Sequence, residues 1–373
     1  MESLFHLFSQ VADPRVERTK DYPLPEILFL VLSAVVSGVN FLTEIEKFGQ
    51  LRIDWLRKFL PYKNGIPSHH TLGRVLGLLE PDALERMFQD WMEAAACAVD
   101  GVIAIDGKTL RGAIERGNNR SFVHMVSAFA SVNGVVLGQV RTHEKSNEIT
   151  AIPKLLETLH LKGNIVTIDA MGCQSRIARQ IVQRGGDFVI AVKENQPTLY
   201  ADVTEAFREV DGADSECFLS QCVVEGKKAH GRKERRECQT LNAANLLEEP
   251  DKWPDVKSFV RVVSQRTVGE KTETNARYFI SSIADLSAEP ALETTRAHWR
   301  IENQLHWSLD VAFREDSCRI YAENAAENLV VVRHVALNML RTVQGLSGGV
   351  ASKRNQAAWS DEIRERVLCA RPK

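Results

Sequence analysis

The chain lacks the cysteine pairs from which a zinc ribbon or a disulfide framework is built. Its seven cysteines are odd in number and scattered, and none lies in a C-x-x-C pair. Reduced thiols are therefore expected, and a zinc ribbon is not. The sequence also contains no internal repeat and no low-complexity tract. With 44% hydrophobic and 26% charged residues in a length of 373, it has the composition of a soluble globular protein of two or three domains.

Long apolar stretches are missing as well. The longest, Ile27 to Val39, covers thirteen residues and is broken by two serines, whereas a membrane helix needs roughly 20. The N-terminus lacks the basic start, apolar stretch and small-residue cleavage site of a signal peptide. We expect this run to form a buried helix, and the protein to have no membrane partner and a cytoplasmic location.

A large excess of one charge is absent, since the formal net charge is −2. This value argues against a chain that coats nucleic acid nonspecifically, because such affinity comes from neutralisation of phosphates by Lys and Arg. Local patches matter more than the sum. The densest basic patch comprises Lys227, Lys228, Arg232, Lys233, Arg235 and Arg236. It is a candidate contact for the DNA backbone, and the alternative is a solvated hairpin face.

Helical spacing dominates residues 1 to 99. Apolar residues recur at helical intervals in three segments, separated by breakers such as the loop from Pro61 to Pro67. Ser68 is placed to cap the helix that follows this loop. The pattern predicts an N-terminal helical domain, which either binds DNA ends or serves only as a packing unit.

From residue 101 strands alternate with helices. Short apolar runs end at Asp106 and Asp169, two strands flank Asn133-Gly134 as in a hairpin, and a further strand ends at Val192. The helices expected between these strands cover Glu148 to His160 and Ser175 to Arg184. The order β-β-β-α-β-α-β predicts a mixed α/β sheet flanked by helices, and it is the order that an RNase H-like fold requires.

After Pro197 the pattern becomes β-rich, with candidate strands at Cys217 to Glu225, Arg232 to Leu241, Phe259 to Val268 and Ala276 to Ile283. Helical spacing resumes near Pro290 in one long segment through Leu309, and a further helix is expected from Ala325 to Val343. The tail beyond Gly345 is weakly specified. The expected organisation is an N-terminal helical domain, the first part of a catalytic core, a β-rich insertion, the C-terminal helices of the core and a tail, at residues 1–99, 100–205, 206–285, 286–345 and 346–373 respectively.

Two aspartates, Asp106 and Asp169, each follow a buried strand. One such Asp alone would more often cap a turn. The first and fourth strands lie side by side in the expected fold, however, about 4.8 Å apart. Two carboxylates brought together in a cleft are costly unless a cation neutralises them, and oxygen ligands with open positions suit Mg²⁺ or Mn²⁺. The pair therefore predicts a metal site.

A third acid, Glu302, comes from the segment HWRIENQLHWSLD at residues 298–310. In one continuous α-helix, His298, Glu302 and His306 would fall on one face at four-residue spacing. The same stripe could be a solvent-facing surface or a zinc site formed by the two histidines. The other acids from which Glu302 has to be chosen are Asp310, Glu315 and Asp316.

Three carboxylates holding two metal ions roughly 3.5 to 4 Å apart would suit hydrolysis of a phosphodiester, followed by attack of the released 3′ oxygen on a second phosphate. Strand cutting and strand joining would then be one chemistry. The side chains expected to orient phosphates or the scissile strand are Lys108, Arg111, His298, Arg300 and His306.

An ordered set of motifs resembles a known group. The motifs are AIDGKTLRGA around Asp106, HEKSNEITAIP at 143–153, TIDAMGCQ around Asp169, AVKENQP at 191–197, HGRKERR at 230–236, YFISS at 278–282 and HWRIENQLHWSLDVAFREDSCR at 298–319. Together they resemble the H-repeat-associated insertion-sequence transposases of the DDE transposase superfamily. The segments DPRVERTKDYPLPEIL and IPSHHTLGRVL are similar to the domain that those proteins carry before the catalytic core.

The resemblance implies an RNase H-like DNA nuclease and strand transferase that uses two Mg²⁺ or Mn²⁺ ions held by Asp106, Asp169 and Glu302. Its partners would be double-stranded DNA, as the element's terminal repeats and target DNA, and a second copy of the chain in a homodimer. Related transposases often carry Tyr, Arg and Lys around the Glu, and the residues at these places are Thr295, His298 and Leu309. The alternative is a catalytically inactive, transposase-derived DNA-binding protein.

Overall fold

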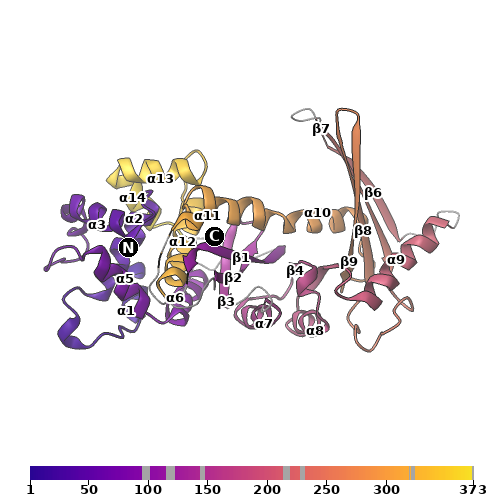
Figure 1. The fold of residues 1–373 in the computed structure, drawn as a ribbon, viewed down its shortest axis with the longest axis horizontal. Helices are drawn as coiled ribbons and strands as arrows, with labels where there is room; N and C mark the ends of the chain where they lie inside the picture. Colours follow the sequence, from indigo (N-terminus) through magenta and orange to yellow (C-terminus); the bar gives the residue numbers. More distant parts are fainter. Residues whose placement is uncertain are drawn as a thin grey trace. The chain divides into compact units, whose positions relative to one another are not determined.

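The computed structural model describes residues 1–94, 101–114, 122–142, 148–212, 219–226, 232–318, 320 and 324–371. The chain divides into two compact units. The first combines Met1–Ala98, Gly107–Asn147 and Glu302–Lys373, and the second combines Val99–Asp106 and Glu148–Ile301. The elements of each are labelled in Figure 1.

The first unit is mainly helical. Its helices are α1 (Glu2–Gln10), α2 (Leu24–Val36), α3 (Leu42–Leu51), α4 (Ile53–Leu56), α5 (His69–Leu78), α6 (Pro81–Ala94), α11 (Trp307–Val311), α12 (Ala325–Thr342), α13 (Val350–Trp359) and α14 (Asp361–Leu368). The antiparallel strands β2 (Phe122–Ala130) and β3 (Val135–Thr142) form the expected hairpin, with Gly134 at a positive φ of 70° in its turn. Ser68 caps α5 as expected, because its hydroxyl accepts the Thr71 N–H.

The core of this unit is built around α2 and α12. Nearly every residue of α2 is buried, as the apolar run predicts. α12 contacts α2, α5, α6 and β3, and its buried amides are bonded. Asn328 Nδ2 donates to the carbonyls of Leu76 and Leu79 at the end of α5, at 2.7 and 2.9 Å. Asn338 both donates to and accepts from the backbone of Val136, at 2.8 and 2.9 Å. The N-terminal and C-terminal helices therefore share one core.

The second unit contains a mixed sheet in the order β1-β4-β5-β9-β8-β7-β6. Its strands are β1 (Val102–Ile114), which continues past Asp106 into the first unit, β4 (Ile165–Ile168), β5 (Asp187–Val192), β6 (Ser220–Glu225), β7 (Arg232–Asn242), β8 (Ser258–Val268) and β9 (Lys271–Ser281). β1, β4 and β5 are parallel, whereas β9 pairs antiparallel with β5 and starts the antiparallel part. The β-rich segment is thus a continuation of the same sheet.

Helices cover this sheet. They are α7 (Glu148–Thr158), α8 (Ser175–Gln183), α9 (Pro197–Gly212) and α10 (Ala288–His298). α10 contacts β4, β5, β6, β7 and β8, while α7 and α8 lie on the side of β4 away from α10 (Figure 1). Among the helices of the described residues, none combines the length and the apolar character that crossing a membrane requires. The mixed α/β architecture flanked by helices is confirmed.

Three expectations about local structure are wrong, and the tail, whose structure the sequence left unspecified, is helical. The strand containing Asp106 does not end there but runs on to Ile114. The segment after Pro197 forms helix α9, because Pro fits the first turn and apolar residues Leu199, Val203 and Phe207 are buried at helical spacing. The single helix expected through Leu309 is divided by a π-helix, Ile301–His306. The tail beyond Gly345 forms the ordered helices α13 and α14.

Candidate active site

Asp106 and Asp169 lie at the same level of two neighbouring strands. β1 and β4 pair in parallel from Val102 with Ile165 through Ile105 with Ile168, and the two aspartates are the next residue of each strand. Neighbouring strands are about 4.8 Å apart. Both side chains are partly exposed. The strand register therefore brings the two acids to the same end of two neighbouring strands.

The loop after β4 fixes the orientation of Asp169. Asp169 Oδ1 accepts the backbone N–H groups of Met171 at 3.0 Å and Gly172 at 3.3 Å, and so caps the short 3₁₀ turn Ala170–Gly172. Gly172 is required by close approach, because an added Cβ would lie 2.3 Å from a methyl of Ile168. The carboxylate is thereby held in place by its own turn.

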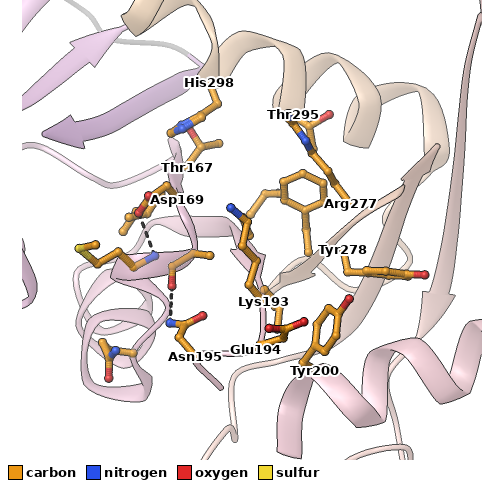
Figure 2. Close-up of a pocket in the computed structure, with 18 of the residues that line it drawn as sticks. Thr167, Asp169, Lys193, Glu194, Asn195, Tyr200, Arg277, Tyr278, Thr295 and His298 are labelled. Carbon is orange, nitrogen blue, oxygen red and sulfur yellow. Dashed lines mark hydrogen bonds between the residues drawn. The ribbon is translucent and has the colours of Figure 1, made fainter. Parts of the chain in front are cut away.

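A second segment clamps the same loop from the end of β5. Asn195 Nδ2 donates to the carbonyl of Ala170 at 2.7 Å (Figure 2). Gln196 Nε2 donates to the carbonyl of Cys173 at 2.9 Å. Burial, and then the charge of Asp169, raise the pKa of the Cys173 thiol to about 12. That thiol therefore stays protonated at neutral pH.

A cleft of about 1030 Å³ opens beside Asp169 within the second unit. It is lined by the ends of β4 and β5, by β9 and by α10, and its lining includes Asp169, Lys193, Glu194, Tyr200, Arg277, Tyr278, Thr295, His298 and Trp299. Figure 2 shows the side chains of His298 and Thr167 meeting above Asp169. His298 Nδ1 lies 3.1 Å from Thr167 Oγ1. Of the residues expected to orient the scissile strand, His298 is thus placed in the cleft.

Glu302 belongs to the first unit and lies in the π-helix, its carboxylate about half exposed. A carboxylate oxygen of Glu302 is 3.6 Å from Nδ1 of His306. π-helical turns are rare and often occur at functional sites. The two histidines of the zinc alternative have different neighbours, since His298 faces Thr167 and His306 faces Glu302.

Lys108 does not extend freely toward a ligand. Its ammonium bonds to Asp310 at 2.7 Å, to Glu315 at 3.0 Å and to Asp316 at 3.3 Å, and its side chain is only 10% exposed. Burial alone would lower the pKa of Lys108, but Glu315 and Asp310 raise it above its ordinary value. These three acids are the alternatives to Glu302 as the third carboxylate of the expected metal site. Because they are bound to Lys108, Glu302 is the more accessible choice.

The arginines of the basic patch are also paired. Arg232 lies 3.3 Å and Arg236 2.7 Å from Glu234, and Arg235 lies 3.0 Å from Glu237. Lys233 is exposed on the same strand, and Arg300 is exposed after α10. Lys227, Lys228 and the side chain of Arg111 lie outside the described residues.

The sequence interpretation missed Lys193, Asn195, Gln196 and Arg277. The first three lie in the motif AVKENQP, where a buried strand gives way to polar residues. From that change, the position of these residues at the edge of the sheet beside Asp169 could have been inferred. The ends of parallel neighbouring strands meet at this edge. Arg277 lies in an exposed strand and carries no comparable signal.

The donor set fits a divalent metal ion. Asp106 and Asp169 offer only oxygen ligands, as Mg²⁺ and Mn²⁺ prefer, and both are accessible to water and phosphate. Two carboxylates on neighbouring strands also repel each other unless a cation lies between them.

Comparison with known proteins gives the family. The chain matches the family described as "Transposase DDE domain" over residues 98–339 and the one described as "DDE_Tnp_1-associated" over residues 5–92. "Putative transposase YncI" of Escherichia coli O157:H7 is 40% identical, covering 99% of this chain and 95% of the relative. "H repeat-associated putative transposase YhhI" of Escherichia coli (strain K12) is 38% identical, covering 99% and 98%.

Two further matches are shorter or more distant. "Inactive transposase YbfQ" of Escherichia coli (strain K12) is 40% identical over 55 residues, which cover 15% of this chain and 66% of the relative. The cryo-EM structure of a piggyBac transposase synaptic complex with hairpin DNA aligns with a TM-score of 0.46 at 10% identity, covering 99% of this chain and 82% of that chain. On the family matches and the full-length relatives, this chain belongs to the DDE transposase family, with H repeat-associated transposases among its relatives.

Proposed function

We propose that the chain cuts DNA at the ends of an insertion sequence and joins those ends to target DNA, with Asp106, Asp169 and Glu302 as its catalytic acids. The observation that carries the proposal is the register of β1 and β4, which pairs Ile105 with Ile168, the residues directly before Asp106 and Asp169. The family supports it, because a DDE domain is named for such acids. The core would be RNase H-like, since the hairpin of β2 and β3 follows β1 in the chain and the parallel strands β4 and β5 come after it.

The three acids would hold two Mg²⁺ or Mn²⁺ ions. When bound, such ions activate water and stabilise charge on the phosphate that is attacked. Asp169 contributes an oxygen whose direction is fixed by the Met171 and Gly172 amides. Glu302 follows His298 by four residues, so the chain itself limits its distance from the Thr167 contact beside Asp169.

His298 would orient the scissile strand. Its Nδ1 is engaged with the Thr167 hydroxyl, which fixes the ring at the wall of the cleft. Arg300, Lys233, Arg232 and Arg235 are proposed as further contacts to the DNA backbone, and Lys108 as a residue that supports the site through its acids. Because two element ends have to be joined, the active assembly would be a homodimer on double-stranded DNA.

The test is cleavage of DNA that carries the element's own ends, in the presence of Mg²⁺. We expect Asp106→Asn, Asp169→Asn and Glu302→Gln each to abolish cleavage. Glu157→Gln is the matched control, because Glu157 is an exposed acid on α7 outside the cleft. Cleavage that survives the three substitutions would refute the assignment of the acids. Binding to the ends without cleavage by the wild type would instead favour the inactive, DNA-binding alternative.

A further inference from the structure

The cleft beside Asp169 contains two permanently positive side chains, Lys193 and Arg277, among its described lining residues. The structure records no ion pair for either of them within the described part of the chain. This contrasts with Arg261, which is bonded to Asp211 at 2.6 Å through both of its terminal nitrogens. The positive charge of the cleft is therefore available to a ligand.

Lys193 is held close to the Asp169 loop by the residues that follow it. β4 and β5 pair in parallel up to Ile168 with Ile190, and Lys193 comes directly after β5. Asn195 and Gln196 then bond to the backbone of the Asp169 loop. The backbone of Lys193 is thus anchored while its side chain is exposed and extends into the space between Asp169 and Tyr278 (Figure 2).

Arg277 is restrained without being neutralised. It lies on β9, and its guanidinium carbon is 4.6 Å from the centre of the Trp299 ring at the end of α10. Stacking on an aromatic face limits the conformations of an arginine but leaves its charge and its hydrogen-bond donors free for an anion. Trp299 itself is 44% exposed, so this stacked pair faces solvent.

We propose that Lys193 and Arg277 bind phosphates of the DNA strand that passes through this cleft to Asp169. The proposal rests on the proposed function, because it names DNA contacts of the same site. A phosphodiester backbone is the ligand that fits, since its negative charges repeat along an extended chain and the two cations lie next to the paired residues Val192 and Tyr278 on the neighbouring strands β5 and β9. Lys193 supplies a point charge and Arg277 a planar fork of donors.

The salt dependence of binding tests this directly. The dissociation constant of the full-length chain for DNA carrying the element's ends would be measured over a range of KCl concentrations without divalent metal, so that cleavage does not contribute. Each lost phosphate contact lowers the slope of log K against log salt by about 0.9. We expect such a decrease for Lys193→Gln and for Arg277→Gln, and none for Arg277→Lys, which keeps the charge.

Lys162→Gln is the matched control. Lys162 is exposed like Lys193 but precedes β4, at the end of that strand opposite to Asp169. A slope that stays at the wild-type value in Lys193→Gln and Arg277→Gln overturns the inference, as does an equal decrease in the control. A wild type that binds no DNA overturns both this inference and the proposed function. A wild type that binds with the expected slopes but never cleaves overturns only the catalytic part.

Discussion

Lys108 and Lys193 show two opposite uses of the same side chain. Lys108, two residues after Asp106, is surrounded by three carboxylates and almost buried. Lys193, at the end of β5, is exposed in a cleft and its charge has no recorded partner among the described residues. The closeness of a lysine to a proposed catalytic acid in the sequence therefore does not indicate that it contacts the substrate. What decides is whether the fold supplies a carboxylate for it.

The largest effect that separates these two lysines is expected on stability. Lys108→Met would remove one of the cations beside Glu315, whose side chain is 2% exposed, and leave the acids around it in place. Breaking a buried charge pair costs about 3 to 5 kcal/mol, and because Asp310 and Asp316 remain partly hydrated we expect about 3 kcal/mol in the free energy of unfolding. Urea denaturation of the full chain measures it. Lys193→Met should change that free energy by no more than about 0.5 kcal/mol.

A comparable loss in the two lysine variants would break the comparison. So would a Lys108→Met variant as stable as the wild type, because the three acids would then have found another counter-charge.

The second prediction concerns pH and the same charged cluster. Burial lowers the pKa of His334 on α12 to about 4, with Glu315 opposing this shift and His306, Lys108 and Arg333 adding to it. The unfolded chain takes up this proton near the ordinary value of 6.5 and the folded chain only near 4. The contribution of His334 to stability should therefore fall as pH decreases from 6.5 toward 4, by up to about 1.4 kcal/mol per pH unit.

Burial also raises the pKa of Glu85 to about 8, which changes stability in the opposite direction over this range. The effect of His334 is therefore measured as the difference in urea midpoint between the wild type and His334→Gln at pH 7, 6 and 5. His160→Gln, at an exposed histidine of the second unit, is the control. Glu315 does not alter the stability change expected over this pH range. Burial alone would raise its pKa, but Lys108 and Arg333 hold that pKa below its ordinary value of 4.5, so its contribution is lost only at lower pH. An unchanged pH dependence in His334→Gln would contradict the assignment.

The smallest effect is expected from the arginines of β7. Arg232 and Arg235 already have glutamate partners, so part of any gain from a DNA phosphate is offset by the lost ion pair. The double variant Arg232→Gln/Arg235→Gln should lower the salt slope of DNA binding by less than Lys193→Gln/Arg277→Gln does. The same titration measures both. A larger decrease for the β7 pair would reverse the contrast between paired and unpaired cations.

Periodicity alone predicts much of this fold. The ends of β7 and β8 are predicted to within about one residue, because charged and apolar side chains mark the two strands clearly. The closeness of Asp106 to Asp169 is also predicted from the sequence, since it depends only on which strands are neighbours in the sheet. Helix α9 is not predicted, because its sequence mixes polar and apolar residues in the same way as the strands that follow it.

Other features depend on contacts that spacing does not contain. The π-helix at Ile301–His306 interrupts an otherwise helical pattern without a proline or glycine to mark it. The ordered tail is held by contacts with remote residues: Arg354 donates to the carbonyls of Val35 and Val39 in the first unit. The pairing of Lys108 with Asp310 joins residues that are 202 positions apart. Such pairings arise only when the chain is folded.

The bond from Asn195 to the carbonyl of Ala170 has a consequence for how copies of such genes are judged. Mobile elements accumulate substitutions after insertion, and a copy is commonly scored as intact when its three acids and reading frame survive. The loop that carries Asp169 is held by the side-chain amide of Asn195, which lies 26 positions after Asp169 in the chain. A descendant that keeps every acid but replaces Asn195 would pass as functional by its motifs after losing the support of its second aspartate.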